Sequence, residues 1–372
     1  MKIRLLGGFG QMFNNVFRNK KVLITGDTGF KGSWLCIWLN SLGAEIYGYS
    51  LPPISSNDNF VVSGLYDVIK HHDGDVRDFN KLYNYIKEIK PDFAFHLAAQ
   101  PIVIEAYKNP KYTFETNIIG TLNFLESIRL TDSVKVALVI TSDKCYKNNE
   151  WIWGYRENDP LGGKDPYSSS KAAAELIVEA YINSYFQKED TCNVASVRAG
   201  NVIGGGDWSP YRIVPDFFRA YFNGTSLVIR NPQSIRPWQF ILEPLSGYLN
   251  LAERLFNVGK IFQGAWNFGP NQSNHKTVKT LVEKLIENIN SNSPHIIFEK
   301  TDYQEAKMLA LDISKANYYL NWEPILNFDQ TVSFTVEGYT LEGNSNFLFE
   351  RIKQIELYCE LAKQKKIIWA IL

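Results

Sequence analysis

The sequence lacks net charge, a cysteine framework and any long apolar run. Its 372 residues include 39 basic and 39 acidic side chains, so the formal charge at pH 7 is zero, and no overall field would attract nucleic acid or an anionic membrane. The four cysteines are scattered, with no spacing typical of a metal site or a disulfide framework, which indicates a reducing compartment. No stretch approaches the roughly eighteen apolar residues of a membrane span. We therefore expect a cytoplasmic, soluble protein with no metal site and no nucleic-acid or membrane partner.

The chain does contain enough apolar material for a large core. Hydrophobic residues make up 45% of it and aromatic residues 14%, and the length allows two domains. Residues 1–11 carry two basic side chains before Leu5 and Leu6, but glycines interrupt the apolar part and no small-residue cleavage site follows. A signal peptide is therefore not expected. We expect residues 1–11 to form a flexible tail, with Met12 as an alternative start.

A glycine-rich loop lies between an expected strand and an expected helix near the N-terminus. Residues 21–25 are a short β-type run, Gly26, Gly29 and Gly32 follow, and apolar residues recur at helical spacing over 33–42. Glycines at these positions let the backbone approach a pyrophosphate, whose charge meets the N-terminus of the helix. The loop alone would be weak evidence, but together with its flanking strand and helix it predicts a dinucleotide site.

The second expected strand, 44–49, bears on the choice of dinucleotide. Ser50 stands where a ribose-binding carboxylate is usual, and no Arg or Lys follows up to residue 59 to bind a 2′-phosphate. NAD is therefore favoured, although Lys31 in the glycine loop leaves a 2′-phosphate contact open.

Further strands are expected at 67–72 and 92–97. The first leads to Asp75, whose carboxylate is either an adenine contact or a turn residue, and the second contains His96, which we interpret as a core histidine. The predicted cofactor-binding residues are Gly26, Thr28, Gly29, Phe30, Lys31, Gly32, Ser50, Asp75, Val76, Leu97, Ala98, Ala99, Gln100, Thr116, Tyr167 and Lys171.

A polar hexapeptide, Thr141-Ser142-Asp143-Lys144-Cys145-Tyr146, follows the apolar run 135–140. The run reads as a buried strand of a parallel sheet, and such strands deliver their last residues to the edge where doubly wound folds bind ligands. A solvated turn is the alternative.

Tyr167 and Lys171 follow the hexapeptide, four residues apart on one face of an expected helix. Tyrosine has an unperturbed pKa of about 10, so it acts as a base near neutrality only if its phenolate is stabilised, and a nearby ammonium and an oxidised nicotinamide would do so. The short hydroxyl of Ser142 could orient the substrate oxygen.

Through Thr25 to Gly32, His96 to Gln100, Ser142 and the Tyr167/Lys171 pair, the chain resembles the extended short-chain dehydrogenase/reductase superfamily. Three longer blocks, 141–146, 200–208 and 235–239, resemble those of CDP-glucose 4,6-dehydratases. The resemblance implies a doubly wound α/β fold, bound NAD and CDP-glucose as substrate.

The resemblance also implies a role for each catalytic residue. Tyr167 removes the proton of the C4 hydroxyl while hydride passes to NAD, and Asp143, kept protonated, donates to the departing C6 hydroxyl. Lys144 is expected to be the C5 acid/base, because burial beside Lys171 would neutralise its ammonium. Alternatively, Lys144 only stabilises the enolate, and water or Tyr167 moves the proton. The predicted catalytic residues are Ser142, Asp143, Lys144, Tyr167 and Lys171, and the predicted substrate-binding residues are Gln100, Ser142, Asn201 and Arg236.

The expected organisation is a nucleotide-binding domain interleaved with a smaller substrate domain. The first comprises 20–199 and a returning segment at about 233–262, and the second comprises 200–232 and 263–345. By analogy we expect a homodimer through the amphipathic segments near 113–130 and 167–187.

Two departures from the resemblance bear on the substrate pocket. Phe240 and Gln304 stand where histidines are expected. A dehydratase or epimerase for another nucleotide-sugar is therefore the nearest alternative, and a catalytically silent NAD-binding regulator is the alternative of another class.

Overall fold

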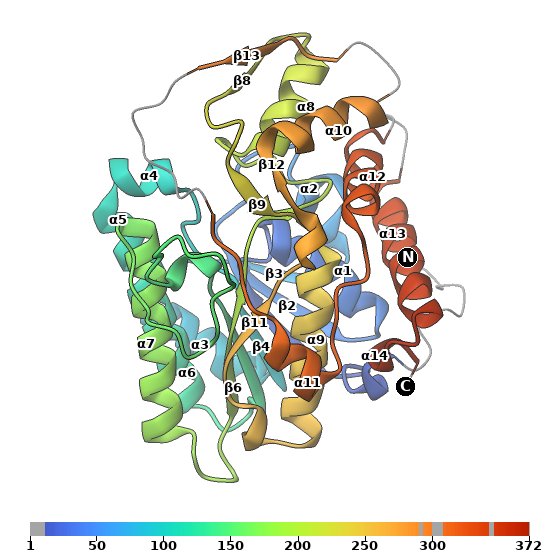
Figure 1. Ribbon diagram of the computed structural model, residues 1–372. Coiled ribbons are helices and arrows are strands. Elements are labelled where there is room, and N and C mark those ends of the chain that lie inside the picture. The colour runs from blue at the N-terminus through green and yellow to red at the C-terminus, as the bar shows by residue number, and fades with distance from the viewer. Residues whose placement is uncertain (1–11, 290–292, 300–307, 342–345, 372) are drawn as a thin grey trace.

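A computed structural model describes residues 12–289, 293–299, 308–341 and 346–371 of the chain. A seven-stranded sheet forms its centre (Figure 1), and every neighbouring pair of strands in this sheet runs parallel. In spatial order the strands are β11 (Gly264–Phe268), β6 (Asn193–Ala199), β5 (Val136–Ile140), β4 (Phe93–His96), β1 (Lys21–Thr25), β2 (Glu45–Ser50) and β3 (Lys70–Asp73). The chain order reverses direction between β1 and β4, which is where such sheets bind ligands. The predicted doubly wound α/β fold is confirmed.

Helices cover both faces of this sheet because both faces are apolar (Figure 1). One face packs against α1 (Phe30–Ser41) and α9 (Leu242–Asn257). The other packs against α3 (Phe79–Ile89), α6 (Gly120–Arg129) and α7 (Pro166–Tyr185). All five residues of β5 are buried as a result, and its carboxyl end opens directly into the polar hexapeptide.

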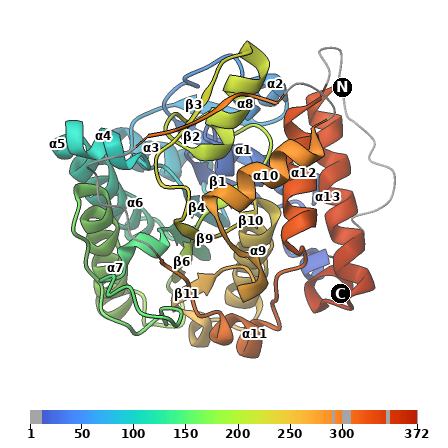
Figure 2. The same ribbon diagram turned by 45° about the horizontal axis from the view of Figure 1, so that its top comes forward.

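A smaller α/β part has its own apolar core beside the sheet (Figure 2). Its helices are α8 (Ile213–Asn223), α10 (Val278–Asn288) and α12 (Phe328–Tyr339). Its short strands form three pairs: β7 (Val202–Ile203) with β10 (Gln239–Phe240), β8 (Leu227–Ile229) with β13 (Ile296–Phe298), and β9 (Ile235–Pro237) with β12 (His275–Thr277). Strand β11 belongs to the large sheet, where it is the edge strand next to β6.

The two ends of the described chain lie together outside α1 (Figure 1). Helix α13 (Phe347–Gln364) packs against α1, and α14 (Ile368–Ile371) packs against the turn Met12–Asn15. The rings of Phe13 and Trp369 stack there with centroids 5.0 Å apart. The expected tail, 1–11, lies outside the described residues. No helix in the described part of the chain is both long enough and apolar enough to span a bilayer.

The remaining helices are short. They are α2 (Asn59–Val62), α4 (Val103–Lys108), α5 (Pro110–Phe114), α11 (Ser314–Leu320), a π-helix at Glu115–Ile119, and 3-10 turns at Leu65–Asp67, Asp143–Cys145, Lys260–Phe262 and Gln272–Asn274.

Candidate active site

The glycine loop closes tightly over the carboxyl ends of β1 and β4. Gly26 has a φ of +76°, and a Cβ atom on it would lie 2.7 Å from the backbone nitrogen of Ala98. A Cβ atom on Gly32 would lie 2.1 Å from the carbonyl oxygen of Gly26. Only glycine therefore allows the loop to turn directly into α1, and the free N–H groups at the start of that helix form a cradle for a diphosphate.

The adenosine end of the predicted cofactor site lies along β2 and β3. The hydroxyls of Thr28 and Ser50 are hydrogen-bonded at 2.9 Å, and Thr28 also donates to the carbonyl oxygen of Leu51. The Asp75 carboxylate is held by Arg77 at 2.6 Å, and hydrogen bonding from this guanidinium lowers the pKa of Asp75. Asp75 is therefore charged, and the Arg77 pair fixes its direction.

Thr116 and Val76 line the adjoining wall. Thr116 lies in the π-helix Glu115–Ile119, and its buried hydroxyl has no hydrogen-bond partner among the described residues. Val76 packs under Gly120, where a Cβ atom would lie 2.7 Å from the valine methyl. A buried hydroxyl without a partner, in a π-helix, fits a polar ligand such as a dinucleotide.

Gln100 is held in this wall by a hydrogen-bond network that the sequence did not reveal. Its side-chain amide donates to the carbonyl oxygen of Ile102 and to the hydroxyl of Thr113, at 3.1 and 2.9 Å. Asn117 binds both backbone groups of Gln100 and donates to the Ser170 hydroxyl on α7 at 2.9 Å. A direct contact of the Gln100 side chain with a ligand would therefore require exchange of one of these bonds.

The hexapeptide after β5 begins a 3-10 turn that turns Asp143 inward. The Ser142 hydroxyl caps this turn by accepting from the Lys144 N–H at 3.2 Å, and it donates to the Asp143 carboxylate at 2.9 Å. Asp143 is buried, and burial raises its pKa, although the Lys144 charge and the Ser142 hydrogen bond oppose this shift. The structure thus places a carboxyl group with increased proton affinity beside a serine.

Tyr167 and Lys171 are one turn apart at the start of α7. The helix begins beside Asp165, whose carboxylate accepts from the Ser168 N–H at 3.0 Å. Burial raises the pKa of Tyr167 to about 12, with the Ser142 hydroxyl acting in the opposite direction. Burial also lowers the pKa of Lys171 to about 8, and its ammonium donates to the carbonyl oxygen of Ile140 at 3.3 Å.

The predicted burial of Lys144 beside Lys171 is wrong. The same turn that directs Asp143 inward leaves Lys144 exposed, with its Nζ 5.9 Å from the centroid of the Tyr167 ring. The Lys144 side chain is therefore accessible and lies near the ring of the predicted catalytic tyrosine.

Two further cations lie near these groups, and neither was predicted as a catalytic residue. Burial and then the charge of Arg212 lower the pKa of Lys31 to about 8, while Asp143 and Asp207 oppose the shift. Arg212 is paired with Asp207 at 2.9 Å, and its charge acts on Tyr167. The charges of Asp143 and Lys171 both act on Lys31, so this lysine lies within electrostatic reach of two predicted catalytic residues. The glycine-rich block before Arg212 is the signal that could have drawn attention to it.

Of the predicted substrate residues, Gln100 and Ser142 lie at the large sheet, whereas Asn201 and Arg236 lie on short segments of the smaller part. Asn201 connects β6 to β7, and its carbonyl oxygen accepts from the Gln239 N–H at 3.1 Å. Arg236 lies on β9 and donates to the carbonyl oxygen of Ile235 at 2.9 Å. Phe240 is buried against Trp34 and Phe334, in a purely aromatic setting. Gln304 lies outside the described residues.

His96 is a core histidine, as predicted. It is buried, its Nδ1 is 2.8 Å from the Thr25 hydroxyl, and its ring stacks on Phe124. Burial lowers its pKa to about 3, so the ring is neutral.

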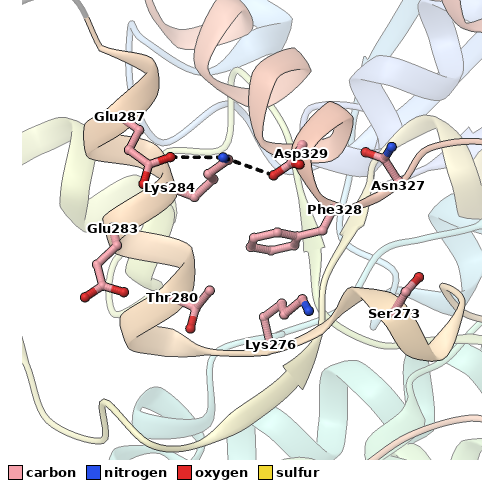
Figure 3. A pocket seen from close by; sticks show the side chains of 9 residues that line it. All are labelled: Ser273, Lys276, Thr280, Glu283, Lys284, Glu287, Asn327, Phe328 and Asp329. Carbon is pink, nitrogen blue, oxygen red and sulfur yellow. Dashed lines mark hydrogen bonds and ion pairs between the residues drawn. The ribbon is translucent and has the colours of Figure 1, made fainter.

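None of the predicted site residues lines a surface pocket of about 480 Å³ (Figure 3), although Lys276 in its lining pairs with Arg236 between β12 and β9. It is formed by α10, the β12 segment and the start of α12, and Lys284 bridges Glu287 and Asp329 at its rim.

The parallel sheet, the glycine loop and the Ser142, Tyr167 and Lys171 side chains together define an extended short-chain dehydrogenase/reductase. The profile of the family described as GDP-mannose 4,6 dehydratase matches residues 23–335, and the chain belongs to this family.

Among similar proteins, the CDP-glucose 4,6-dehydratase of Salmonella typhimurium is 46% identical over 329 residues, covering 87% of this chain and 92% of the relative. The dTDP-glucose 4,6-dehydratase of Xanthomonas campestris pv. campestris is 25% identical over 341 residues, covering 85% and 92%. The solved dTDP-glucose 4,6-dehydratase of Bacillus anthracis, in complex with NAD, has a TM-score of 0.72 at 22% identity, covering 89% of this chain and 99% of that one. That of Streptomyces venezuelae, with NAD bound, has a TM-score of 0.74 at 21% identity, covering 86% and 96%.

Proposed function

We propose that this protein is a CDP-glucose 4,6-dehydratase that converts CDP-glucose to CDP-4-keto-6-deoxyglucose and water with NAD as resident cofactor. The observation that carries the reaction type is the buried Asp143 carboxyl, with its raised pKa, beside Ser142 and near Tyr167. An oxidoreductase needs only the serine, tyrosine and lysine, whereas loss of water also needs a proton donor for the departing hydroxyl. The 46% identity to the Salmonella enzyme supports CDP-glucose as substrate.

The first step is deprotonation of the C4 hydroxyl by Tyr167. When bound at the glycine loop, NAD would supply the acceptor for hydride from C4 and the source of hydride for C6. Because burial raises the pKa of Tyr167, this residue needs the positive charge of its surroundings to act as a base near neutrality. Lys171 and the exposed ammonium of Lys144 supply that charge from the protein, and Ser142 orients the substrate oxygen.

The second step is elimination across C5 and C6. The new C4 carbonyl makes the C5 hydrogen acidic, and protonated Asp143 donates to the C6 hydroxyl as water leaves. Lys144 is the C5 acid/base in this proposal: its exposed ammonium must first lose a proton to solvent, the neutral amine then accepts the C5 proton, and a proton returns from Lys144 to C5 when hydride is delivered to C6. Replacing Lys144 with Met and following solvent deuterium into C5 tests the assignment: undiminished exchange would remove Lys144 from that role and leave it as a charge that stabilises the enolate.

The segments 200–232 and 263–345, together with β9, which carries Arg236, are proposed to bind the nucleotide-sugar. Arg236, Arg212 and Asn201 supply hydrogen bonds to its diphosphate and sugar oxygens. The proposed assembly is a homodimer through α6 and α7, which sedimentation at micromolar concentration tests, and the proposed compartment is the cytoplasm.

The function is tested by incubating the purified protein with CDP-, dTDP- and GDP-hexoses and following the 4-keto product. Inert CDP-glucose with an active dTDP- or GDP-sugar would replace the substrate assignment. Bound NAD with no turnover of any nucleotide-sugar would favour a silent regulator, and mass analysis of what copurifies with the protein identifies the cofactor directly.

A further inference from the structure

Glu175 is a buried carboxylate one helical turn after Lys171, and it has no part in the proposed chemistry. One of its oxygens accepts from the Thr141 hydroxyl, at the end of β5. The other accepts from the Ser196 hydroxyl at 2.6 Å and from the Arg198 guanidinium at 2.8 Å, both on β6. A single side chain of α7 therefore joins the helix to two neighbouring strands.

Arg198 extends the network to the far end of the catalytic hexapeptide. It donates to the Tyr146 hydroxyl at 2.6 Å and to the carbonyl oxygen of Glu157 at 3.0 Å. The Tyr146 hydroxyl in turn donates to Asn267 on β11 at 2.8 Å. The first and last residues of the hexapeptide are thus held by the two partners of one ion pair.

Both partners of this pair are almost fully buried, at 3% and 2% exposure of their side chains. Burying two charges costs solvation energy that their attraction often only offsets, so such a pair is weak evidence for stability by itself. Its directed hydrogen bonds, in contrast, fix geometry. Here they fix the exit of β5, which carries Ser142, against the turn of α7 that carries Lys171.

We propose that Glu175 is a positioning residue for the reaction, which keeps Ser142 and Lys171 in register by holding Thr141. This inference rests on the proposed function for its kinetic test. An electrostatic consequence accompanies the geometry: the Glu175 carboxylate raises the pKa of Lys171 against the effect of burial and so keeps its ammonium charged at higher pH.

The geometric part is tested with a matched pair of variants. Thr141→Val and Ser196→Ala each remove one hydroxyl that donates to Glu175. Only Thr141, however, is next to Ser142 in the chain. We expect Thr141→Val to lower kcat about tenfold or more with KM unchanged, since small displacements of catalytic groups are costly. Ser196→Ala should stay within about twofold of wild type. Equal effects of the two variants, with equal losses of thermal stability, would show that Glu175 serves the fold alone and overturn the proposal.

The effect of the Glu175 charge on Lys171 is tested by comparing Glu175→Gln with Glu179→Gln. The second variant removes the same charge from an exposed position one turn further along α7. In Glu175→Gln the alkaline limb of the pH profile of kcat/KM should move to lower pH, because Lys171 loses its proton earlier. Glu179→Gln should leave the profile in place. Coincident pH profiles for Glu175→Gln and Glu179→Gln would overturn the proposal. If Glu175→Gln does not fold, the comparison of Thr141→Val with Ser196→Ala decides.

A readout without substrate separates this inference from the proposed function. Protein labelled with 13Cε-lysine is titrated by NMR, and Lys171→Arg identifies the Lys171 signal. Wild-type protein that makes no 4-keto product would refute the proposed function. A Lys171 titration midpoint at lower pH in Glu175→Gln than in Glu179→Gln would still support the positioning role. An unchanged midpoint in active enzyme refutes the electrostatic part alone.

Discussion

Replacing Glu243 with glutamine should change how the stability of this protein depends on pH. Glu243 is a buried carboxyl at the start of α9. It accepts from the backbone N–H groups of Ile325 and Leu326, at 2.9 and 2.6 Å, and from the Tyr358 hydroxyl at 2.8 Å. It therefore joins the sheet-covering helix α9 to the segment before α12 and to the C-terminal helix α13. Burial raises the pKa of Glu243 to about 7, although the three donors favour its charged form.

The size and sign of the effect follow from linkage. The folded protein keeps the Glu243 proton up to about pH 7, whereas the unfolded chain releases it near its ordinary value of 4.5. Stability from this group is therefore full below about pH 4.5 and is lost as the pH rises to about 7. At 1.36 kcal/mol per pKa unit, the difference between the two ends of this window is about 3 kcal/mol.

The assay is urea unfolding of wild type and Glu243→Gln at pH 5 and pH 8, with the cofactor state held fixed. Glutamine keeps the acceptor for Leu326 and cannot ionise. Any pH-independent difference in unfolding free energy between wild type and Glu243→Gln therefore cancels when the values at pH 5 and pH 8 are compared. We expect wild type to lose about 2.5 kcal/mol relative to the variant between pH 5 and pH 8, because part of the full difference is already lost at pH 5. A difference that stays constant to within about 0.5 kcal/mol would show that the three donors keep the carboxylate charged at both pH values, which would refute the reasoning.

Three further variants test the site. Asp143→Asn keeps the acceptor for the Ser142 hydroxyl but cannot donate a proton to the leaving group, so 4-keto-6-deoxy product should form about 10² to 10⁴ times more slowly, while thermal stability is retained; wild-type rates would exclude Asp143 as the acid. Gly32→Ala places a Cβ atom 2.1 Å from the carbonyl oxygen of Gly26, so we expect loss of bound cofactor and about 1–3 kcal/mol of unfolding free energy, measured by absorbance of the released nucleotide and by denaturation. Arg212→Met removes a charged donor, and calorimetry should show CDP-glucose binding about 10 to 100 times weaker; unchanged affinity would place Arg212 outside the substrate site.

The sequence allowed prediction of those features that depend on local order along the chain. The glycine loop, the alternation of strands and helices and the Tyr167–Lys171 spacing are each set within one or two neighbouring elements, and the structure contains all of them. The interpretation of His96 as a core histidine also holds, because an apolar strand in a parallel sheet is buried on both sides.

What the sequence could not show is how side chains from distant segments meet. Asp27, within the glycine loop, is buried and pairs with His71 at 2.7 Å, and it fits only because Gly48 leaves room for its carboxylate. Lys144 was expected to be buried beside Lys171, but a 3-10 turn directs successive side chains about a third of a turn apart. Its exposure is therefore a consequence of the backbone after Ser142, which residue type alone does not specify.

Burial changes proton affinity in opposite directions for the acids and the bases of this site. It raises the pKa values of Asp143 and Tyr167, and it lowers those of Lys31 and Lys171. Each shift favours the neutral form, so a proton is retained on the group that must donate one to a leaving hydroxyl. The exposed Lys144 then provides positive charge where Tyr167 must become a phenolate, without the cost of burying another cation. Neutralising Lys144 should therefore raise the pH at which the first deprotonation occurs, whereas neutralising Asp143 should not raise that pH, because the Asp143 charge raises the pKa of Tyr167, and should slow the loss of water.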